Sequence, residues 1–239
     1  MNSSNLLSDP ELRRFGGQIS LPEVGIKNQE KLKSAKVAVI GAGGLGSFVL
    51  QHLAALGVGH LGIIDYALVD EKNIQRQTLY GGNDLGKLKT IISKQNLQNL
   101  FPFANFEMIN LELTFNNAER ILKPFDLVID ATSSFSFHEV LSDACENLST
   151  PWIVGSVKGF SGSVTVSNSS GKTAIKNFHE HIDKISNSDS GYISLSYGLV
   201  GNLTALEAFK LLVGIESSLQ NKILLVDILN HQFTVKSLD

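Results

Sequence analysis

The chain has 239 residues, of which 43% are hydrophobic and 18% charged, so it can bury the core of one large domain and is unlike a disordered chain. Its net charge of −3 provides no general attraction to nucleic acid or to anionic membranes. The single cysteine, Cys145, excludes an internal disulfide and any zinc site built from several cysteines. We therefore expect a cytoplasmic protein that binds neither nucleic acid nor membrane and holds no zinc.

Apolar runs alternate with helix-length segments through the first 150 residues. Short β-rich runs that lead into Gly or Asp predict strands at 36–40, 61–65 and 126–130. Apolar residues at helical spacing predict helices at about 45–56, 85–100 and 137–148. This alternation is typical of right-handed βαβ units, and it predicts an α/β, Rossmann-like fold with a mainly parallel sheet flanked by helices.

The pattern changes beyond residue 150. Residues 152–168 predict two antiparallel strands, and the polar stretch 167–191 is interpreted as a surface connection or lid. A long helix is expected at 192–214, and two C-terminal strands separated by Asn230-His231 predict a hairpin. The sequence therefore predicts that antiparallel C-terminal strands continue the parallel sheet within a single domain, residues 1–239.

A glycine-rich turn follows the first predicted strand directly. Gly41, Gly43 and Gly46 satisfy the pattern G-x-G-x-x-G, and Gly44 stands beside them. Such glycines let the backbone approach the phosphates of a nucleotide at the start of the next helix. Asp65 ends the second strand about 20 residues later, where an acid accepts hydrogen bonds from ribose hydroxyls. Because these features serve NAD and ATP equally, they predict a nucleotide without choosing between the two.

The segment 64–89, IDYALVDEKNIQRQTLYGGNDLGKLK, favours ATP. Arg76 can contact phosphate oxygens through two N–H groups, Lys89 can supply a point charge near the α-phosphate, and Asn73 can position either. A dehydrogenase has no evident use for this cluster just after its ribose-binding acid. For each residue taken singly, a solvated polar loop with incidental charges is the alternative.

The sequence resembles the ATP-dependent activators of ubiquitin-like proteins, because it contains several of their motifs in the order in which that family has them. This family includes the bacterial molybdopterin-synthase and thiazole-pathway sulfur-carrier adenylyltransferases (ThiF/MoeB/HesA). The resemblance begins near Arg14 and covers almost the whole chain. It is carried by GAGGLG, LAALGVGHLGIID, NIQRQ, GKLK, Asp130-Ala-Thr132, Asp143-Ala-Cys145, the GxVTV strand near Gly162, and ALEAFKLLVG at 205–214.

The resemblance implies that ATP activates the C-terminal Gly-Gly carboxylate of a small ubiquitin-fold carrier protein, giving an acyl-adenylate and pyrophosphate. It assigns the catalytic roles to Asn73, Arg76 and Lys89. It assigns nucleotide binding to Gly41, Gly43, Gly44, Asp65, Gln77, Asp130, Thr132 and Ser133. It also implies Mg²⁺ with the ATP, a homodimer, a nucleotide-binding half at about 30–150 and a carrier-binding half at about 151–239.

The sequence departs from the family's pattern in four ways. Ser133 stands where the family usually has an Mg²⁺-binding Asp, and a neutral hydroxyl is a weak Mg²⁺ ligand. Gly17 replaces an arginine that the partner subunit's active site receives, and Ala67 replaces a frequent second acid. The two Cys-x-x-Cys zinc pairs are absent, and Asn187 falls near the place where some relatives have a reactive cysteine.

Three function classes follow from these residues. The first is an active carrier-protein adenylyltransferase. The second is an ATP-binding relative with weakened catalysis that acts as a partner subunit or scaffold. The third is a dinucleotide-dependent oxidoreductase that uses the same glycine turn. Cys145 is expected to be a buried structural thiol, while SSGKT at 169–173 and the pair His179 and His181 are interpreted as ordinary polar sequence.

Overall fold

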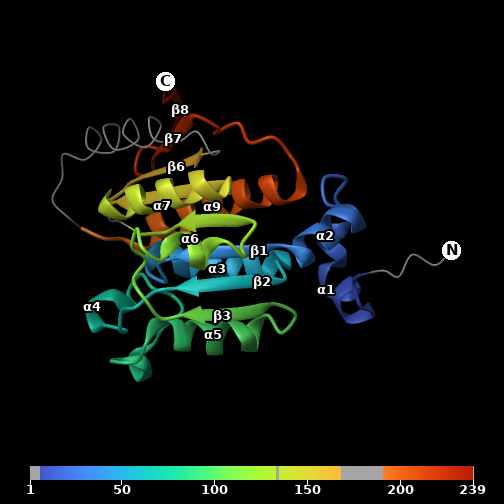
Figure 1. Ribbon diagram of the computed structural model, residues 1–239, viewed down its shortest axis with the longest axis horizontal. Coiled ribbons are helices and arrows are strands. Elements are labelled where there is room, and N and C mark those ends of the chain that lie inside the picture. The colour runs from blue at the N-terminus through green and yellow to red at the C-terminus, as the bar shows by residue number, and fades with distance from the viewer. Residues whose placement is uncertain (1–5, 133–134, 168–190, 239) are drawn as a thin grey trace.

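The structure is a computed structural model, and it describes residues 6–132, 135–167 and 191–238. In these residues eight strands form one sheet in the order β3-β2-β1-β4-β5-β6-β7-β8 (Figure 1). The strands are β1 (Lys36–Ile40), β2 (His60–Ile64), β3 (Asn105–Ile109), β4 (Leu127–Asp130), β5 (Trp152–Lys158), β6 (Ser161–Ser167), β7 (Lys222–Asp227) and β8 (Gln232–Ser237). The neighbouring strands β3, β2, β1, β4 and β5 are parallel to one another. The strands β6, β7 and β8 extend this sheet in antiparallel pairs. The predicted Rossmann-like fold is confirmed.

Helices pack on both faces of the parallel strands. One face carries α3 (Gly44–Leu56), α5 (Lys89–Leu100) and α9 (Ser194–Val213), and the other carries α6 (Ala118–Leu122) and α7 (Phe135–Leu148). The packing of β1 shows why its sequence is apolar after Lys36. Its alternate side chains Val37 and Val39 enter the first core, while Ala38 and Ile40 enter the second. A strand that is buried on both faces has no polar side, so it appears in the sequence as an unbroken apolar run.

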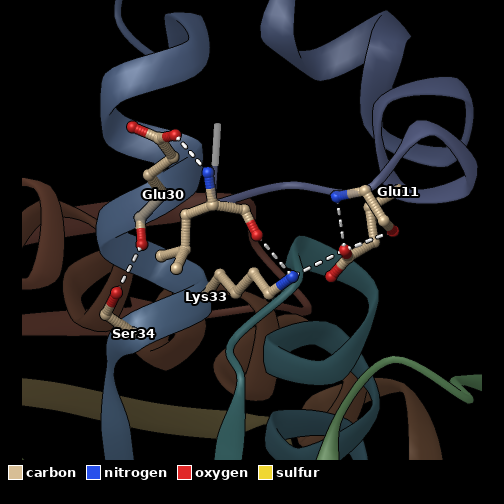
Figure 2. A network of polar contacts seen from close by, with 6 residues as sticks. Glu11, Glu30, Lys33 and Ser34 are labelled. Atoms are coloured by element: carbon tan, nitrogen blue, oxygen red, sulfur yellow. Dashed lines mark hydrogen bonds and ion pairs between the residues drawn. The ribbon is translucent and has the colours of Figure 1, made fainter. Parts of the chain in front are cut away.

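Two helices precede the sheet, α1 (Asp9–Ile19) and α2 (Gly25–Ser34), and both lie at the end of the sheet where β1 begins (Figure 1). A partly buried ion pair connects them: Lys33 Nζ lies 2.6 Å from Glu11 Oε2 and also donates to the carbonyl of Leu6 (Figure 2). Ser8 donates its backbone N–H to the same carboxylate, at 2.9 Å. Burial opposes ionisation of Glu11, but the hydrogen bonds from Lys33 and Ser8 outweigh it and lower the pKa of that carboxyl.

The segment that leads into α5 differs from its prediction. A helix was expected from residue 85, whereas α5 begins at Lys89. The preceding residues form the short 3₁₀ helix η1 (Gly82–Asp84), and Gly86 adopts φ +74°, which is incompatible with a continuous α-helix. Lys87 and Lys89 then pair through their backbones with the loop after β2, because Val69 N–H donates to Lys87 O and Lys89 N–H donates to Ala67 O. This pairing brings the start of α5 beside the end of β2.

Several further elements were not predicted from the sequence: α1, α2, α4 (Glu71–Ile74), α6 and β3. β3 lies at the edge of the sheet, where Phe106 is its one buried side chain, so it lacks the apolar run of a central strand.

The long helix at 192–214 is confirmed as α9, and no helix in the described part of the chain is both long and apolar enough to span a membrane. The hairpin of β7 and β8 is also confirmed, with residues 228–231 between its strands. The proposed lid, the SSGKT stretch and the two histidines fall at 168–190, outside the described residues.

Candidate nucleotide-binding site

A pocket of about 440 Å³ opens at the carboxyl ends of the parallel strands. The chain leaves β1 toward β2 on one side, and it returns to β4 on the other side of β1. Connections diverge at such a point, and open α/β sheets bind their ligands in the crevice that this divergence leaves. The pocket volume lies within the range of small-molecule sites.

Most of the predicted site residues meet in this pocket. Those that line it are Gly41, Gly43, Gly44, Asp65, Asn73, Arg76, Gln77, Lys89 and Thr132. Asp130 is not among the lining residues of the described pocket, and Ser133 is outside the described residues. Residues that sequence reasoning missed also line it, among them Gly155 of β5 and the two tyrosines Tyr192 and Tyr197.

The glycine turn is held in position by two side chains. Gly41 has φ +90°, and a Cβ there would lie 3.1 Å from the carbonyl oxygen of Ala131, so a larger residue would be strained and crowded. The peptide groups on both sides of Ala42 are also held, because Ala42 N–H donates to Asp65 Oδ2 at 2.8 Å and Ala42 O accepts from Tyr80 OH at 2.6 Å. Burial raises the pKa of Tyr80, which keeps its hydroxyl a donor. The turn is therefore preformed before any ligand binds.

Asp65 also connects two loops. Its Oδ1 accepts from the N–H of Ala67 at 2.7 Å, so both carboxylate oxygens hold backbone near the pocket. Each oxygen of a carboxylate has capacity for a second hydrogen bond, which leaves Asp65 able to accept from ribose hydroxyls. Tyr80 was not foreseen, since a tyrosine three residues after Gln77 has no feature in the sequence that distinguishes it from core residues.

Arg76 and Lys89 supply the positive charge of the pocket. The Arg76 guanidinium donates to the carbonyl of Lys72 at 3.1 Å and to Asn73 Oδ1 at 2.8 Å, so Asn73 orients it. Lys89 is only 7% exposed and is the first residue of α5. A buried ammonium is costly unless an anion neutralises it, and the pocket that Lys89 lines is the place where an anion would do so.

Gln77 offers an independent sign of a polar ligand. Its side chain is buried at 4% exposure, and its Oε1 has no hydrogen-bond partner among the described residues. A buried polar atom without a partner costs about 1–3 kcal/mol, so a partner is normally present. Because Gln77 lines the pocket beside Gly43, a bound ligand is well placed to supply that partner.

Asp130 acts on the backbone behind the pocket. Its Oδ1 accepts from both the N–H and the hydroxyl of Thr132, each at 2.8 Å, and its Oδ2 lies 3.3 Å from Nε2 of His138. Burial lowers the pKa of His138 to about 4, so its imidazole is neutral at physiological pH. In this arrangement Asp130 shapes the turn that presents Thr132. The nucleotide-binding role assigned to Asp130 stays a prediction.

The sequence matches the ThiF family over residues 15–238. This chain belongs to the ThiF family. A probable molybdopterin-synthase adenylyltransferase from Porphyra purpurea is 36% identical over 219 residues, which cover 90% of this chain and 57% of that protein. A sulfur carrier protein adenylyltransferase from Thermus thermophilus is 36% identical over 238 residues, which cover 93% of this chain and 86% of that protein.

The chain thus spans little more than half of one ThiF relative and most of another. The fold is also that of the crystal structure of E. coli MccB with ATP, which matches with a TM-score of 0.81 at 19% identity. The match covers 98% of this chain and 74% of that chain. At this identity the likeness supports the ThiF fold alone.

The structure describes two of the departures from the ThiF pattern. Ala67 lines the pocket, where it offers its backbone N–H to Asp65. Gly17 lies in α1, and a Cβ there would meet no atom within 4 Å. Residues of α1 do not line the described pocket of their own chain, and Arg14 stacks over Phe103 instead, 5.4 Å from the ring centroid. Ser133 and Asn187 are outside the described residues.

Proposed function

We propose that this ThiF-family protein adenylates the C-terminal Gly-Gly carboxylate of a small ubiquitin-fold sulfur-carrier protein. The observation that carries the proposal is the meeting of Asn73, Arg76 and Lys89 with the glycine turn in one pocket at the switch point of the sheet. Both relatives are named as adenylyltransferases, which supports the same reaction. The substrates are then Mg-ATP and the carrier, and the products are the acyl-adenylate and pyrophosphate.

The residues of the pocket suit this chemistry. A carboxylate is a weak nucleophile, so catalysis depends on holding it in line with the α-phosphorus and on neutralising charge as the bond to pyrophosphate breaks. Arg76 and Lys89 form the cationic wall of the pocket, and they supply that neutralisation. The free N–H groups at the start of α3 face the phosphates, and Asp65 accepts from the ribose. Gln77 offers its buried Oε1 to the nucleotide.

The remaining parts of the proposal rest on the family resemblance. Mg²⁺ enters as the counter-ion of ATP, as the resemblance implies. The chain works as a single cytoplasmic adenylation domain, 1–239, and as a homodimer. Its half at 30–150 binds the nucleotide. The carrier docks on the half at 151–239, where β8 exposes Phe233 and Val235 by 53% and 52%.

Cys145 does not take part in this chemistry. It is fully buried on α7, and burial together with the nearby Asp130 charge raises the pKa of its thiol to about 12. A thiol that stays protonated and enclosed cannot attack an acyl-adenylate. The reaction proposed for this chain therefore ends at the adenylate.

The test is ATP–pyrophosphate exchange with Mg²⁺ and the Gly-Gly-ended carriers encoded in the same organism. Carrier-dependent exchange that falls about 100-fold or more in Arg76→Ala is expected, as for loss of a donor aimed at developing charge. Lys72→Ala is the matched control, because this neighbouring cation is 79% exposed and its side chain does not line the described pocket. ATP binding without exchange, whichever carrier is supplied, would instead identify a catalytically weakened relative.

A further inference from the structure

Arg76 is held on its flat face by aromatic rings that no sequence pattern connected with it. Its Cζ lies 4.2 Å from the ring centroid of Tyr192 and 5.9 Å from that of Tyr197. Tyr192 precedes α9 by two residues, and Tyr197 lies in the first turns of that helix. Both rings also line the pocket. The start of α9 therefore forms an aromatic wall against the arginine of the cationic wall.

This arrangement leaves the arginine able to bind phosphate. An aromatic ring contacts the face of a guanidinium, whereas hydrogen bonds leave from its edge. One part of that edge is already committed to the carbonyl of Lys72 and to Asn73 Oδ1. These two hydrogen bonds and the hydrogen bond to the Tyr197 side chain occupy at most three of the five N–H groups that a guanidinium carries, so N–H groups remain for an anion in the pocket. Stacking and edge bonding together restrict the rotation of the side chain.

The second ring connects the arginine to the glycine turn. A Cβ on Gly44 would lie 2.8 Å from Cδ1 of Tyr197, so the ring rests directly against the first residue of α3. Burial raises the pKa of Tyr197, so its side chain is a neutral phenol at neutral pH. Tyr197 thus contacts two groups that would bind the same phosphates, the backbone of the turn and the side chain of Arg76.

Packing alone does not account for Tyr192. Its ring is 54% exposed, so it buries little surface against the core and contributes little to folding. An exposed ring of this kind can restrain the neighbouring Arg76 with little effect on the stability of the fold. We propose that Tyr192 and Tyr197 are positioning residues that hold the Arg76 guanidinium with its free edge toward the phosphates of the nucleotide. This inference rests on the proposed function for the identity of the nucleotide.

The deciding variants are at Tyr192, because Tyr197 is buried and its replacement would also change packing. Dissociation constants for Mg-ATP and for inorganic pyrophosphate are measured by calorimetry without carrier. Tyr192→Leu is expected to weaken both by about two- to fivefold, the range for a cation–π contact at an exposed site. Tyr192→Phe keeps the aromatic face and is expected to bind within about twofold of the wild type. Leu195→Ala is the matched control, because Leu195 is 69% exposed in the first turn of α9. This variant is expected to change neither the dissociation constant for Mg-ATP nor that for pyrophosphate.

A double-mutant cycle separates positioning from general damage. In an Arg76→Gln background, Tyr192→Leu is expected to have no further effect, because the ring acts through the arginine. Equal weakening in both backgrounds, or no effect of Tyr192→Leu in the wild type, would overturn the inference. If the wild type binds pyrophosphate in a Tyr192-dependent way but does not bind ATP, the proposed function fails and the positioning role stands. If the wild type binds neither anion, both are wrong.

Discussion

Replacing Gly44 with alanine tests how the glycine turn and the aromatic wall fit together. The added Cβ would lie 2.8 Å from Cδ1 of Tyr197 and 3.0 Å from its Cε1 and Cγ. Carbon atoms at rest contact one another at about 3.5–4.0 Å, so the ring must move by several tenths of an ångström. Tyr197 is 9% exposed and packs where α9 lies against α3, so its ring can shift only on the side that lines the pocket.

The expected cost follows from this crowding. Overpacking a close-packed site costs about 1–3 kcal/mol, and the better helix propensity of alanine returns up to about 1 kcal/mol. We expect Gly44→Ala to lower the free energy of unfolding by about 1–2 kcal/mol and the Tm by roughly 2–8 °C for a chain of this size. Affinity for ATP should fall as well, because the displaced ring contacts Arg76.

The assay is thermal unfolding and urea unfolding, followed by titration with Mg-ATP. Gly17→Ala is the control, because a Cβ added to this helical glycine would have no neighbour within 4 Å, and the variant is expected to gain about 0.4–1 kcal/mol. The double variant Gly44→Ala with Tyr197→Val removes the ring, so its two effects should be non-additive by about 1 kcal/mol or more. If Gly44→Ala has the stability and the ATP affinity of the wild type, the close contact between Gly44 and Tyr197 is refuted.

Three other outcomes follow from the structure. Gly46→Ala places a Cβ 1.8 Å from the carbonyl oxygen of Gly41, so backbone must move, and urea unfolding should show a loss of more than about 3 kcal/mol; a loss below about 1 kcal/mol would contradict the geometry. Cys145, with its thiol pKa raised to about 12 by burial, should not react with an aromatic disulfide at pH 8 until urea unfolds the chain, and rapid labelling of the folded protein would show that α7 is open. Because the pKa of Glu11 is lowered in the folded state, its ion pair with Lys33 stabilises the chain above the ordinary value of 4.5 and is lost as pH falls through the lower folded value. The stability advantage of the wild type over Glu11→Gln should therefore shrink in acid unfolding curves below pH 4.5, and an advantage independent of pH would argue against that pair.

Much of the candidate nucleotide site could be predicted because its residues are close together in the sequence. The glycine turn lies between a strand and a helix that periodicity identifies, and Asp65 directly follows the next strand. Arg76 and Asn73 follow within one loop and one short helix. Local rules of turn geometry and hydrogen bonding operate over such distances, so the residue types alone indicated phosphate and ribose chemistry.

Other predictions required the fold and could not be made locally. The carboxylate of Asp130 holds Thr132 and lies beside His138, two contacts that the sequence does not indicate, while its nucleotide role stays a prediction. A residue at the end of a strand can direct its carboxylate toward the pocket or toward the next turn, and only the path of the chain after β4 decides between them. The start of α5 was misplaced for a similar reason, because the backbone pairing of Lys87 with Val69 is a contact between segments.

The sequence by itself determined the alternation of strands and helices, the family, and the cationic cluster near the glycine turn, because periodicity and short motifs are local properties of the chain. Only the tertiary structure brought Tyr192 and Tyr197 to Arg76, and Tyr80 to the carbonyl of Ala42. An aromatic residue in an apolar helix looks the same in sequence whether its ring fills the core or lines a pocket. Burial of both faces of the sheet sets which helices lie side by side, and that packing decided which of the rings became part of the site.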